Sequence, residues 1–404
     1  MTGRVQVAVG TIARFHSFDL AYQLQRHGSL AAIYTAYPRR VFRGTGVESQ
    51  RIRTFPWLQT PTAVMRGRRL IPRFAQRNLD WWAHQTFDRY LARHLVDCHV
   101  LSVLSGSGLA AGKAAQARGI AYVCDRGSSH IVYQDRILRE EYGLLGLPFA
   151  GVDPRIMAKE QREYEQADAI TVPSGFVHRS FVEEGVAEAK LHRIPYGVNL
   201  DTFRPLAELD GAERGKEFRV LFVGQLSVRK GLHYLLQAFS RAALPKARLV
   251  LVGSPQPETD ELLRRYPVAA LERTGTLPQP EVARQMSRAS VLVLPSVEEG
   301  LAMVQAQALA CGCPVIATVN TGSEDLFEDG EQGFIVSIRD ADAIAERLTT
   351  LHDDRQLQAQ MSVAALARGH KLGGGETYGR ASINLFRELA VAKGHDVAPL
   401  GSAQ

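Results

Sequence analysis

Two adjacent cations stand out in the second half of the sequence. The apolar run RVLFVG at 219–224 ends in Gly224 and Gln225, and Arg229 and Lys230 follow it before an apolar pattern of helical spacing. Cations at the carboxyl end of a strand, beside the positive end of a helix dipole, suit a bound diphosphate. A solvated basic turn has the same composition, so spacing alone leaves both interpretations open.

A pair of carboxylates follows another strand-like run further along the chain. SVLVLP at 290–295 leads to Glu298 and Glu299, and a nearly apolar helix is expected to begin directly after Gly300. Gln307 lies on the same stripe of that helix as Gly300. Carboxylates and amides hold sugar hydroxyls well, because each accepts hydrogen bonds in two directions. The alternative is that the acids only cap the helix.

Polar side chains also follow two strand-like runs in the first half of the chain. The stretch CDRGSSHIVYQDR at 124–136 crowds an aspartate, an arginine, two serines and His130 after a strand. Such a cluster is a site candidate in an α/β protein, although it would equally cap the next helix. VAVG at 7–10 runs through Thr11 into a loop that can line a cleft. We interpret His16 in that loop as a surface or capping residue.

Short apolar runs rich in β-branched residues alternate with amphipathic segments along most of the chain. Such runs, each followed by a helical stretch, indicate parallel sheets covered on both faces, so the predicted fold class is α/β. The predicted strands are VQVAV at 5–9, HVLSVL at 99–104, IAYVC at 120–124, DAITVP at 168–173, RVLFVG at 219–224, RLVLVG at 248–253, SVLVLP at 290–295 and PVIAT at 314–318.

The chain is expected to form two Rossmann-like, doubly wound domains that face a cleft. Its 404 residues exceed what one hydrophobic core usually holds. Pro, Gly and charged residues replace the periodicity at 193–219, so we place the boundary near 200–216. We expect an N-terminal acceptor-binding domain over 1–200, a nucleotide-sugar-binding domain over 201–375, and a helix over 376–404 that returns to the first domain. A ligand cleft is expected between the carboxyl ends of the two sheets.

The composition limits the classes of protein to which the chain can belong. No apolar run approaches the roughly 20 residues that span a bilayer, and the start of the chain lacks a secretory pattern, so we expect a cytoplasmic protein. The net charge of +6 favours anionic partners without identifying them. The four cysteines fit buried small side chains rather than a disulfide framework or a zinc site. They are Cys98, Cys124, Cys311 and Cys313.

One segment, from Arg39 to Arg77, is both basic and apolar. It contains ten arginines against one acid, Glu48, and large apolar residues such as Trp57 lie between them. This composition indicates an interfacial surface beside an anionic membrane, and a solvated loop is the alternative. A nucleic-acid partner is not expected, because no motif of a nucleic-acid-binding fold accompanies the arginines.

Five longer segments share their order and motifs with one enzyme family. They are VPSGFVHRSF (172–181), RIPYGVNLDTFRP (193–205), VGQLSVRKG (223–231), LPSVEEGLAMVQAQALACGCPVIAT (294–318) and TGSEDLFEDGEQGFIV (321–336). Together they resemble a family 4 retaining glycosyltransferase of the GT-B fold. The resemblance covers most of the chain and is weaker before residue 120, where such enzymes bind their acceptors.

The resemblance implies a donor site on the second domain. Lys230, with Arg229 beside it, would hold the donor diphosphate, and Glu299 would contact hydroxyls of the donor sugar. Gly224 and Gln225 would lie at the same strand end. The family is usually independent of metal, which fits a site where cations and a helix terminus neutralise the leaving diphosphate. No cofactor is expected, because the nucleotide sugar is a substrate.

The resemblance also implies contributions from the first domain and from backbone groups. His130 matches a first-domain histidine that lies near the sugar ring in this family. The loop at Gly10 and Thr11 would close over the diphosphate. Leu301, Ala302 and Met303 are implied to place backbone amides near the phosphates. Gly300, which precedes them, is implied to belong to the donor site.

Two positions depart from the family pattern. The second acid of the motif, which normally grips the nucleotide ribose, is Gln307 in this chain. The arginine that typically follows the strand glycine is Gln225, so Arg229 is expected to supply the missing charge. These departures bear on nucleotide affinity and base preference rather than on fold or donor class.

We interpret the chain as a retaining glycosyltransferase that moves a sugar from a UDP- or GDP-type donor to a hydroxyl of a glycan or lipid-linked acceptor. The expected setting is polysaccharide, lipopolysaccharide or glycolipid assembly. No pair of carboxylates indicates a covalent double displacement, so attack from the same face is expected. The alternative, motivated by Gln225 and Gln307, is a degenerate nucleotide-sugar-binding protein without turnover. A dehydrogenase is set aside, because no G-x-G-x-x-G follows the first strand.

Overall fold

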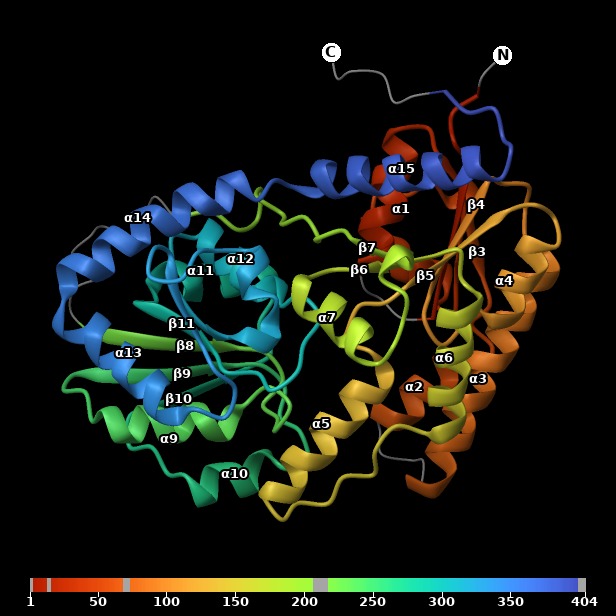
Figure 1. Cartoon of the computed structure of the whole chain (residues 1–404). Coiled ribbons are helices and arrows are strands. Elements are labelled where there is room, and N and C mark those ends of the chain that lie inside the picture. Colours follow the sequence, from red (N-terminus) through yellow and green to blue (C-terminus); the bar gives the residue numbers. More distant parts are fainter. Residues whose placement is uncertain (1–2, 13–15, 68–72, 206–216, 399–404) are drawn as a thin grey trace.

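The computed structural model contains two parallel β-sheets surrounded by helices (Figure 1). It describes residues 3–12, 16–67, 73–205 and 217–398. The predicted α/β class is therefore confirmed, with one sheet in each half of the chain. Most of the predicted domain boundary, at 206–216, lies outside the described residues.

The first sheet has seven parallel strands in the order β3-β2-β1-β4-β5-β6-β7. The order reverses between β1 and β4, which creates a switch point where ligands bind in doubly wound folds. The strands are β1 (Val7–Thr11), β2 (Leu30–Thr35), β3 (Ile52–Thr54), β4 (Val100–Leu104), β5 (Ala121–Asp125), β6 (Ala169–Val172) and β7 (Leu191–Arg193).

The second sheet has six parallel strands in the order β10-β9-β8-β11-β12-β13, with its switch point between β8 and β11. All eight predicted strands are present, and five further strands (β2, β3, β7, β10 and β13) complete the two sheets. The strands of the second sheet are β8 (Phe218–Val223), β9 (Ala247–Val252), β10 (Leu271–Gly275), β11 (Val291–Leu294), β12 (Val315–Thr318) and β13 (Gly333–Val336).

Helices connect the parallel strands and cover the sheets. In the first half they are α1 (Ser17–Arg26), α2 (Gln59–Gly67), α3 (Arg73–His94), α4 (Leu109–Gln116), α5 (Ile131–Leu144), α6 (Pro154–Gln166) and α7 (Gly175–Glu183). In the second half they are α9 (Leu232–Ala242), α10 (Thr259–Arg265), α11 (Gln279–Arg288), α12 (Met303–Ala310), α13 (Ala341–Asp353), α14 (Arg355–Lys371) and α15 (Gly375–Ala392). No described helix is both long enough and apolar enough to cross a membrane.

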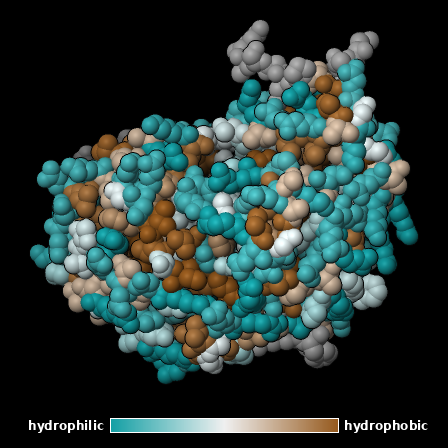
Figure 2. All heavy atoms as spheres, viewed as in Figure 1, coloured by the Kyte–Doolittle hydropathy of each residue, from teal (hydrophilic) through white to brown (hydrophobic). Residues whose placement is uncertain are grey.

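The first sheet is buried on both faces, as its unbroken apolar strands predict. Alternate residues of β1 belong to different cores: Val7 and Val9 pack into one, and Ala8 into the other. Parallel sheets need helices on both faces to bury such strands. Figure 2 shows that hydrophilic side chains cover most of one face of the molecule, with hydrophobic side chains exposed mainly over the middle of the second domain.

Helix α5 belongs to the first domain in sequence but contacts the second (Figure 1). The carboxylate of Glu141 is fully buried near its end and accepts hydrogen bonds from His233 and Tyr234 of α9, at 2.8 and 2.7 Å. Arg339 Nε donates to the same carboxylate at 2.7 Å. Nearer its start, Ile137 packs against Val297. The helix therefore ties the two domains together through a buried polar cluster and an apolar one.

The last two long helices run from the second domain to the first (Figure 1). Helix α14 packs on α12 in the second domain, whereas α15 packs on α1. Apolar residues of α15 such as Ile383 and Phe386 join the core that contains Val7 and Leu24. The end of the chain thus contributes to the core of the first domain.

Candidate active site

The carboxyl ends of the two sheets meet at a pair of glycines. Gly127 follows β5 and Gly300 follows β11. A Cβ on Gly300 would overlap the carbonyl oxygen of Gly127, so the two backbones touch with no side chain between them. Ser174 Oγ donates to the carbonyl oxygen of Gly300 at 2.7 Å. This junction brings the loop after β11, at the switch point of the second sheet, against the turn after β5 of the first domain. A ligand cleft is expected at such a switch point.

Glu298 is a fully buried carboxylate that connects the domains at this junction. Its Oε1 accepts from the backbone N–H and the hydroxyl of Ser129, at 3.1 and 2.6 Å. Its Oε2 accepts from Gln134 at 3.0 Å and from Arg229 Nε at 2.8 Å. Burial alone would raise the pKa of the Glu298 carboxyl, but Arg229 and the other donors outweigh it and lower that pKa.

Lys230 and Glu299 form an ion pair beside the buried one. Their side chains remain 18% and 10% exposed, so a ligand can reach both. Ser296 Oγ lies 3.4 Å from Glu299 Oε1. The site therefore presents a cation that can neutralise a diphosphate and a carboxylate that can accept from hydroxyls, side by side.

The backbone before α12 differs from the expectation in two ways. The helix begins at Met303 rather than directly after Gly300, because residues of this loop bond to other segments instead. Ala302 N–H donates to the carbonyl oxygen of Thr321 at 3.1 Å, so the Ala302 amide is not available to a phosphate. Leu301, also predicted to offer its amide, precedes the helix, and the Met303 amide opens its first turn, where N–H groups have no partner within the helix.

The two glutamines of α12 differ in environment. Gln305 is buried, and its Nε2 donates to the carbonyl oxygen of Thr321 at 3.0 Å. That bond fixes the loop after β12 against the start of α12. Gln307 is half-buried, and its amide has no hydrogen bond to any described part of the chain. Gln307 is thus the glutamine that can still bind a ligand.

The end of β8 needs a glycine and leaves its neighbour in solvent. Gly224 has φ of +154°, a conformation that side chains disfavour, and its carbonyl oxygen packs tightly against Gly253. Gln225 is exposed. Arg229, expected to replace the missing arginine at that position, donates through Nε to both the carboxylate and the carbonyl oxygen of Glu298. Its charge is therefore largely balanced within the protein.

Gly10 and Thr11 lie in the last two positions of β1, not in a loop. Both are buried, and a Cβ on Gly10 would come within 2.6 Å of Leu91 in α3. Gly10 therefore permits close packing of a helix on the strand. The remainder of the predicted diphosphate loop, at 13–15, lies outside the described residues.

His130 is a buried helix cap rather than a group that faces the junction. Its Nδ1 accepts from the backbone N–H of Val132 at 3.3 Å, at the start of α5. Its ring packs on Tyr164 and Phe181, with centroids 5.0 and 4.9 Å away. Burial, with help from Arg126 and Arg136, lowers the pKa of His130 to about 4. The placement of this histidine beside a sugar ring stays a prediction.

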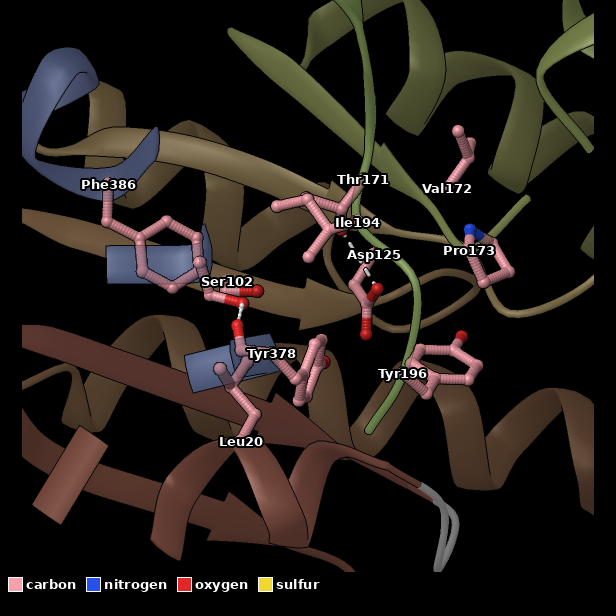
Figure 3. Close-up of a pocket in the computed structure, with 11 residues that line it drawn as sticks. Leu20, Ser102, Asp125, Thr171, Val172, Pro173, Ile194, Tyr196, Tyr378 and Phe386 are labelled. Carbon is pink, nitrogen blue, oxygen red and sulfur yellow. Dashed lines mark hydrogen bonds between the residues drawn. The ribbon is translucent and has the colours of Figure 1, made fainter. Parts of the chain in front are cut away.

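A different histidine, His16, lies at the junction. Its Nε2 is 2.5 Å from Asp125 Oδ2, and Thr171 Oγ1 donates to the other carboxylate oxygen at 2.9 Å. Figure 3 shows Asp125 at the centre of a small cavity of about 10 Å³, between Thr171 and Tyr196. His16, interpreted as a surface or capping residue, does occupy the N-cap position of α1, but its side chain is only 9% exposed and makes no capping hydrogen bond. Its position after the first strand, opposite the polar cluster at 124–136, was the available signal.

Metal-binding side chains do not gather in the part of the chain that the structure describes. No group of three or more His, Cys, Asp or Glu residues is placed to hold a metal ion there. All four cysteines are buried.

Comparison with models of known protein families shows the family to which the chain belongs. Residues 208–368 match the model of glycosyl transferases group 1, and residues 13–202 match that of Glycosyltransferase Family 4. The two matches adjoin and together span most of the chain. The chain is a family 4 glycosyltransferase. The first match contains the Lys230–Glu299 pair, and the second contains the His16–Asp125 pair.

Relatives with known names or structures share the fold of this glycosyltransferase. The D-inositol 3-phosphate glycosyltransferase of Thermomonospora curvata is 29% identical over 251 residues, which are 56% of this chain and 58% of that protein. The chain spans about half the length, or less, of the curated relatives it matches.

Two solved structures establish the GT-B architecture. Sucrose-phosphate synthase from Thermosynechococcus elongatus has a TM-score of 0.72 at 22% identity, over 96% of this chain and 100% of that one. Anabaena Alr3699/HepE, solved with UDP and glucose, has a TM-score of 0.68 at 15% identity, over 95% and 100%.

We predict that Glu298→Gln destabilises the protein by about 3 kcal/mol, because it leaves Arg229 without its buried counter-charge. Thermal unfolding measures this effect. Glu324→Gln is the matched control, since Glu324 pairs with Arg179 across the domains at 2.5 Å but both side chains are exposed. The control is expected to cost less than about 1 kcal/mol. Equal melting temperatures for the two variants would contradict a special role for Glu298.

The lowered pKa of His130 predicts a loss of stability in acid. The unfolded chain takes up a proton near pH 6.5 and the folded chain only near 4, so stability falls as the pH drops through this window. The full difference is about 3 kcal/mol. His130→Asn keeps a capping acceptor but does not titrate, and its melting temperature is expected to fall less between pH 7 and about pH 4.5. Parallel curves for the two proteins would refute this.

Proposed function

We propose that this glycosyltransferase moves a sugar from a nucleotide diphosphate sugar, of UDP or GDP type, to a hydroxyl acceptor with retention of configuration. The Lys230–Glu299 pair at the junction of the two sheets carries the proposal. A diphosphate sugar offers an anion to the lysine and hydroxyls to the glutamate. The likeness in fold to HepE, which was solved with UDP and glucose, supports a donor of this kind.

Donor binding exchanges one set of partners for another. The diphosphate takes the ammonium of Lys230 from Glu299, and the released carboxylate accepts hydrogen bonds from the sugar. Lys230 then neutralises the charge that grows on the diphosphate as the bond to the anomeric carbon breaks. The N–H groups of the first turn of α12, at the positive end of the helix dipole, would add to this neutralisation.

Retention is proposed to follow from attack on the face that the diphosphate leaves. A double displacement needs a free carboxylate as nucleophile on the opposite face. Glu298 does not meet that need, because both of its oxygens are held by Ser129, Gln134 and Arg229. Its burial also separates it from a ligand.

The acceptor is proposed to be a glycan or a lipid-linked molecule, in polysaccharide, lipopolysaccharide or glycolipid assembly. An exposed apolar surface around α2 and α3 supports a membrane partner. Trp57, Val64, Met65 and Trp82 are 77, 50, 37 and 51% exposed there. The basic segment from Arg39 to Arg77 forms part of this surface. Its exposed arginines, among the side chains that the structure describes, are Arg39, Arg40, Arg43, Arg53 and Arg77. Arg68 and Arg69 lie outside the described residues.

The donor test uses UDP, GDP, UDP-glucose and GDP-mannose as probes. A ligand present at 100 times its Kd raises stability by about 2.7 kcal/mol, which a thermal shift detects. We predict that Lys230→Ala lowers nucleotide release by one to two decades or more, because a charge-assisted bond to the diphosphate is worth roughly 1.5–3 kcal/mol. Lys113→Ala, an exposed lysine on α4, is the control and is expected to behave as wild type.

The same measurements distinguish the competing function. Binding of a probe without release of nucleotide, with any acceptor, would favour a degenerate donor-binding protein, for which Gln225 and Gln307 are the motivating departures. Unchanged kinetics in Lys230→Ala would contradict the diphosphate assignment.

A second prediction concerns the surface around α2. We expect the protein to sediment with phosphatidylglycerol vesicles more than with phosphatidylcholine vesicles, and to be released by salt, since the screening length falls to about 3 Å at 1 M. Trp57→Ser with Val64→Ser is expected to reduce binding. Val363→Ser is the control, because Val363 is an exposed apolar residue of α14, in the second domain. Binding that ignores lipid charge and these substitutions would leave the segment as a solvated surface.

A further inference from the structure

A second cavity lies in the first domain, between α6 and the turn that follows α7 (Figure 1). Its volume is about 370 Å³, within the roughly 300–1,000 Å³ of pockets that hold small molecules. His130 and Tyr164 form its buried lining, whereas Gln161 of α6 and Ala187 of the turn are exposed at its sides. No described residue of the second domain lines it, so the cavity is separate from the proposed donor site.

His130 supplies a buried hydrogen-bond donor to this cavity. The residue is only 3% exposed, and its Nδ1 accepts the N–H of Val132. Burial lowers the pKa of the ring to about 4, so at neutral pH the ring is uncharged and carries its one proton on Nε2. Nε2 makes no hydrogen bond within the part of the chain that the structure describes. A buried donor without a partner is costly, so a ligand that brings an acceptor is favoured.

The walls of the cavity offer acceptors for hydroxyl groups. Glu184 lines the cavity with a side chain that is 15% exposed, and its Oε1 lies 3.1 Å from Arg136 Nη1. That contact is an ion pair without hydrogen-bond geometry, so the buried Oε1 has no hydrogen bond to any described residue. A carboxylate can accept several hydrogen bonds, and the amide of Gln161 can both donate and accept. The cavity therefore combines one donor with several acceptors.

The charges around the cavity disfavour a charged ligand. Glu165 and Glu184 place two carboxylates in the lining, and these repel an anion. Lys190 Nζ donates to the carbonyl oxygen of Glu165 at 2.6 Å, so the backbone already satisfies part of its ammonium. A cation would meet Lys190 in the lining and Arg136 beside Glu184. A neutral ligand with several hydroxyls avoids both repulsions and still satisfies His130 and Glu184.

We propose that this cavity binds a neutral saccharide unit at a site separate from the donor cleft. His130 donates through Nε2–H to an oxygen of the sugar, and sugar hydroxyls donate to Glu184 and Gln161. The ring of Tyr164, 5.0 Å from that of His130 between centroids, forms an apolar part of the floor. The inference goes beyond the proposed function, because binding here needs neither a donor nor turnover. It is an alternative to the implied place of His130 beside the donor sugar.

Two positions allow the cavity to be filled without changing the donor residues. Ala187 and Gln161 line the cavity and are exposed, so a tryptophan at either position can occupy it without disturbing the core. Ala189 and Arg162 are exposed near neighbours in the chain that do not line it. Ala187→Trp is therefore matched by Ala189→Trp, and Gln161→Trp is matched by Arg162→Trp.

The experiment measures saccharide binding by saturation-transfer-difference NMR. The probes are maltose and the methyl α-glycosides of glucose, mannose and galactose, with glucose 6-phosphate and glucosamine as charged comparisons. Wild type is expected to bind at least one neutral probe saturably, and more tightly than either charged sugar. Ala187→Trp and Gln161→Trp are expected to weaken that binding about tenfold or more, because the indole fills the cavity. Ala189→Trp, Arg162→Trp and Lys230→Ala are expected to retain wild-type affinity for the probe.

Each result decides the inference. Loss of binding confined to the two blocking variants supports it. Binding that survives both blocks, or that is lost in Lys230→Ala, would place the saccharide in the donor cleft and overturn it. Equal loss in a blocking variant and its matched control, absence of binding by every neutral probe, or tighter binding of a charged sugar overturns it as well. Failure here leaves the proposed function intact, because UDP binding and nucleotide release are measured separately.

Discussion

The buried carboxylate of Glu298 is the interaction on which the cleft depends. A charge removed from water must be paired, and its partners here come from both domains. Arg229 belongs to the same domain as Glu298, whereas Ser129 belongs to the first domain. Satisfying this one charge therefore fixes the turn after β5 against the loop after β11. The contact between Gly127 and Gly300 follows from that placement.

This arrangement divides the charged residues of the junction into two groups. Glu298 and Arg229 satisfy one another inside the protein and set the distance between the domains. Lys230 and Glu299, one position further along each loop, remain accessible from solvent. Neighbouring residues thus differ in environment. The side chain of one lies in the domain interface, and the side chain of the next faces the cleft. Polar groups elsewhere in the interface, such as Glu141 near the end of α5, reinforce the same relative placement.

The sequence predicted those strands that a local run of apolar residues marks. Runs such as Val291–Leu294 are apolar throughout and bounded by Pro or Gly, so their strands were evident. β3 and β7 are three residues long and β10 is a half-exposed edge strand with charged residues, so none has an apolar run to detect.

Contacts between residues far apart in the chain could not be predicted from such local patterns. Nothing in the local sequence distinguishes Glu298 from Glu299, and only the fold shows that one is enclosed. The motif likewise did not show that the ring of His130 packs on Tyr164 and Phe181. The Ala302 amide is taken by Thr321, nineteen residues later in the sequence. Such long-range pairings depend on tertiary structure, which a motif does not encode.

In the proposed function, the ion pair between Lys230 and Glu299 favours a ligand that offers a partner to both residues. An inorganic diphosphate offers the lysine a new partner but leaves the glutamate's charge uncompensated, and a free sugar satisfies the glutamate while leaving the lysine bound to it. Either fragment must therefore disrupt a partly buried contact without replacing both halves. Only a molecule that joins the anion to the hydroxyls restores partners to both residues at once. In the proposed function, the pairing in the empty cleft thus favours a molecule that carries both groups over a separate anion or a free sugar.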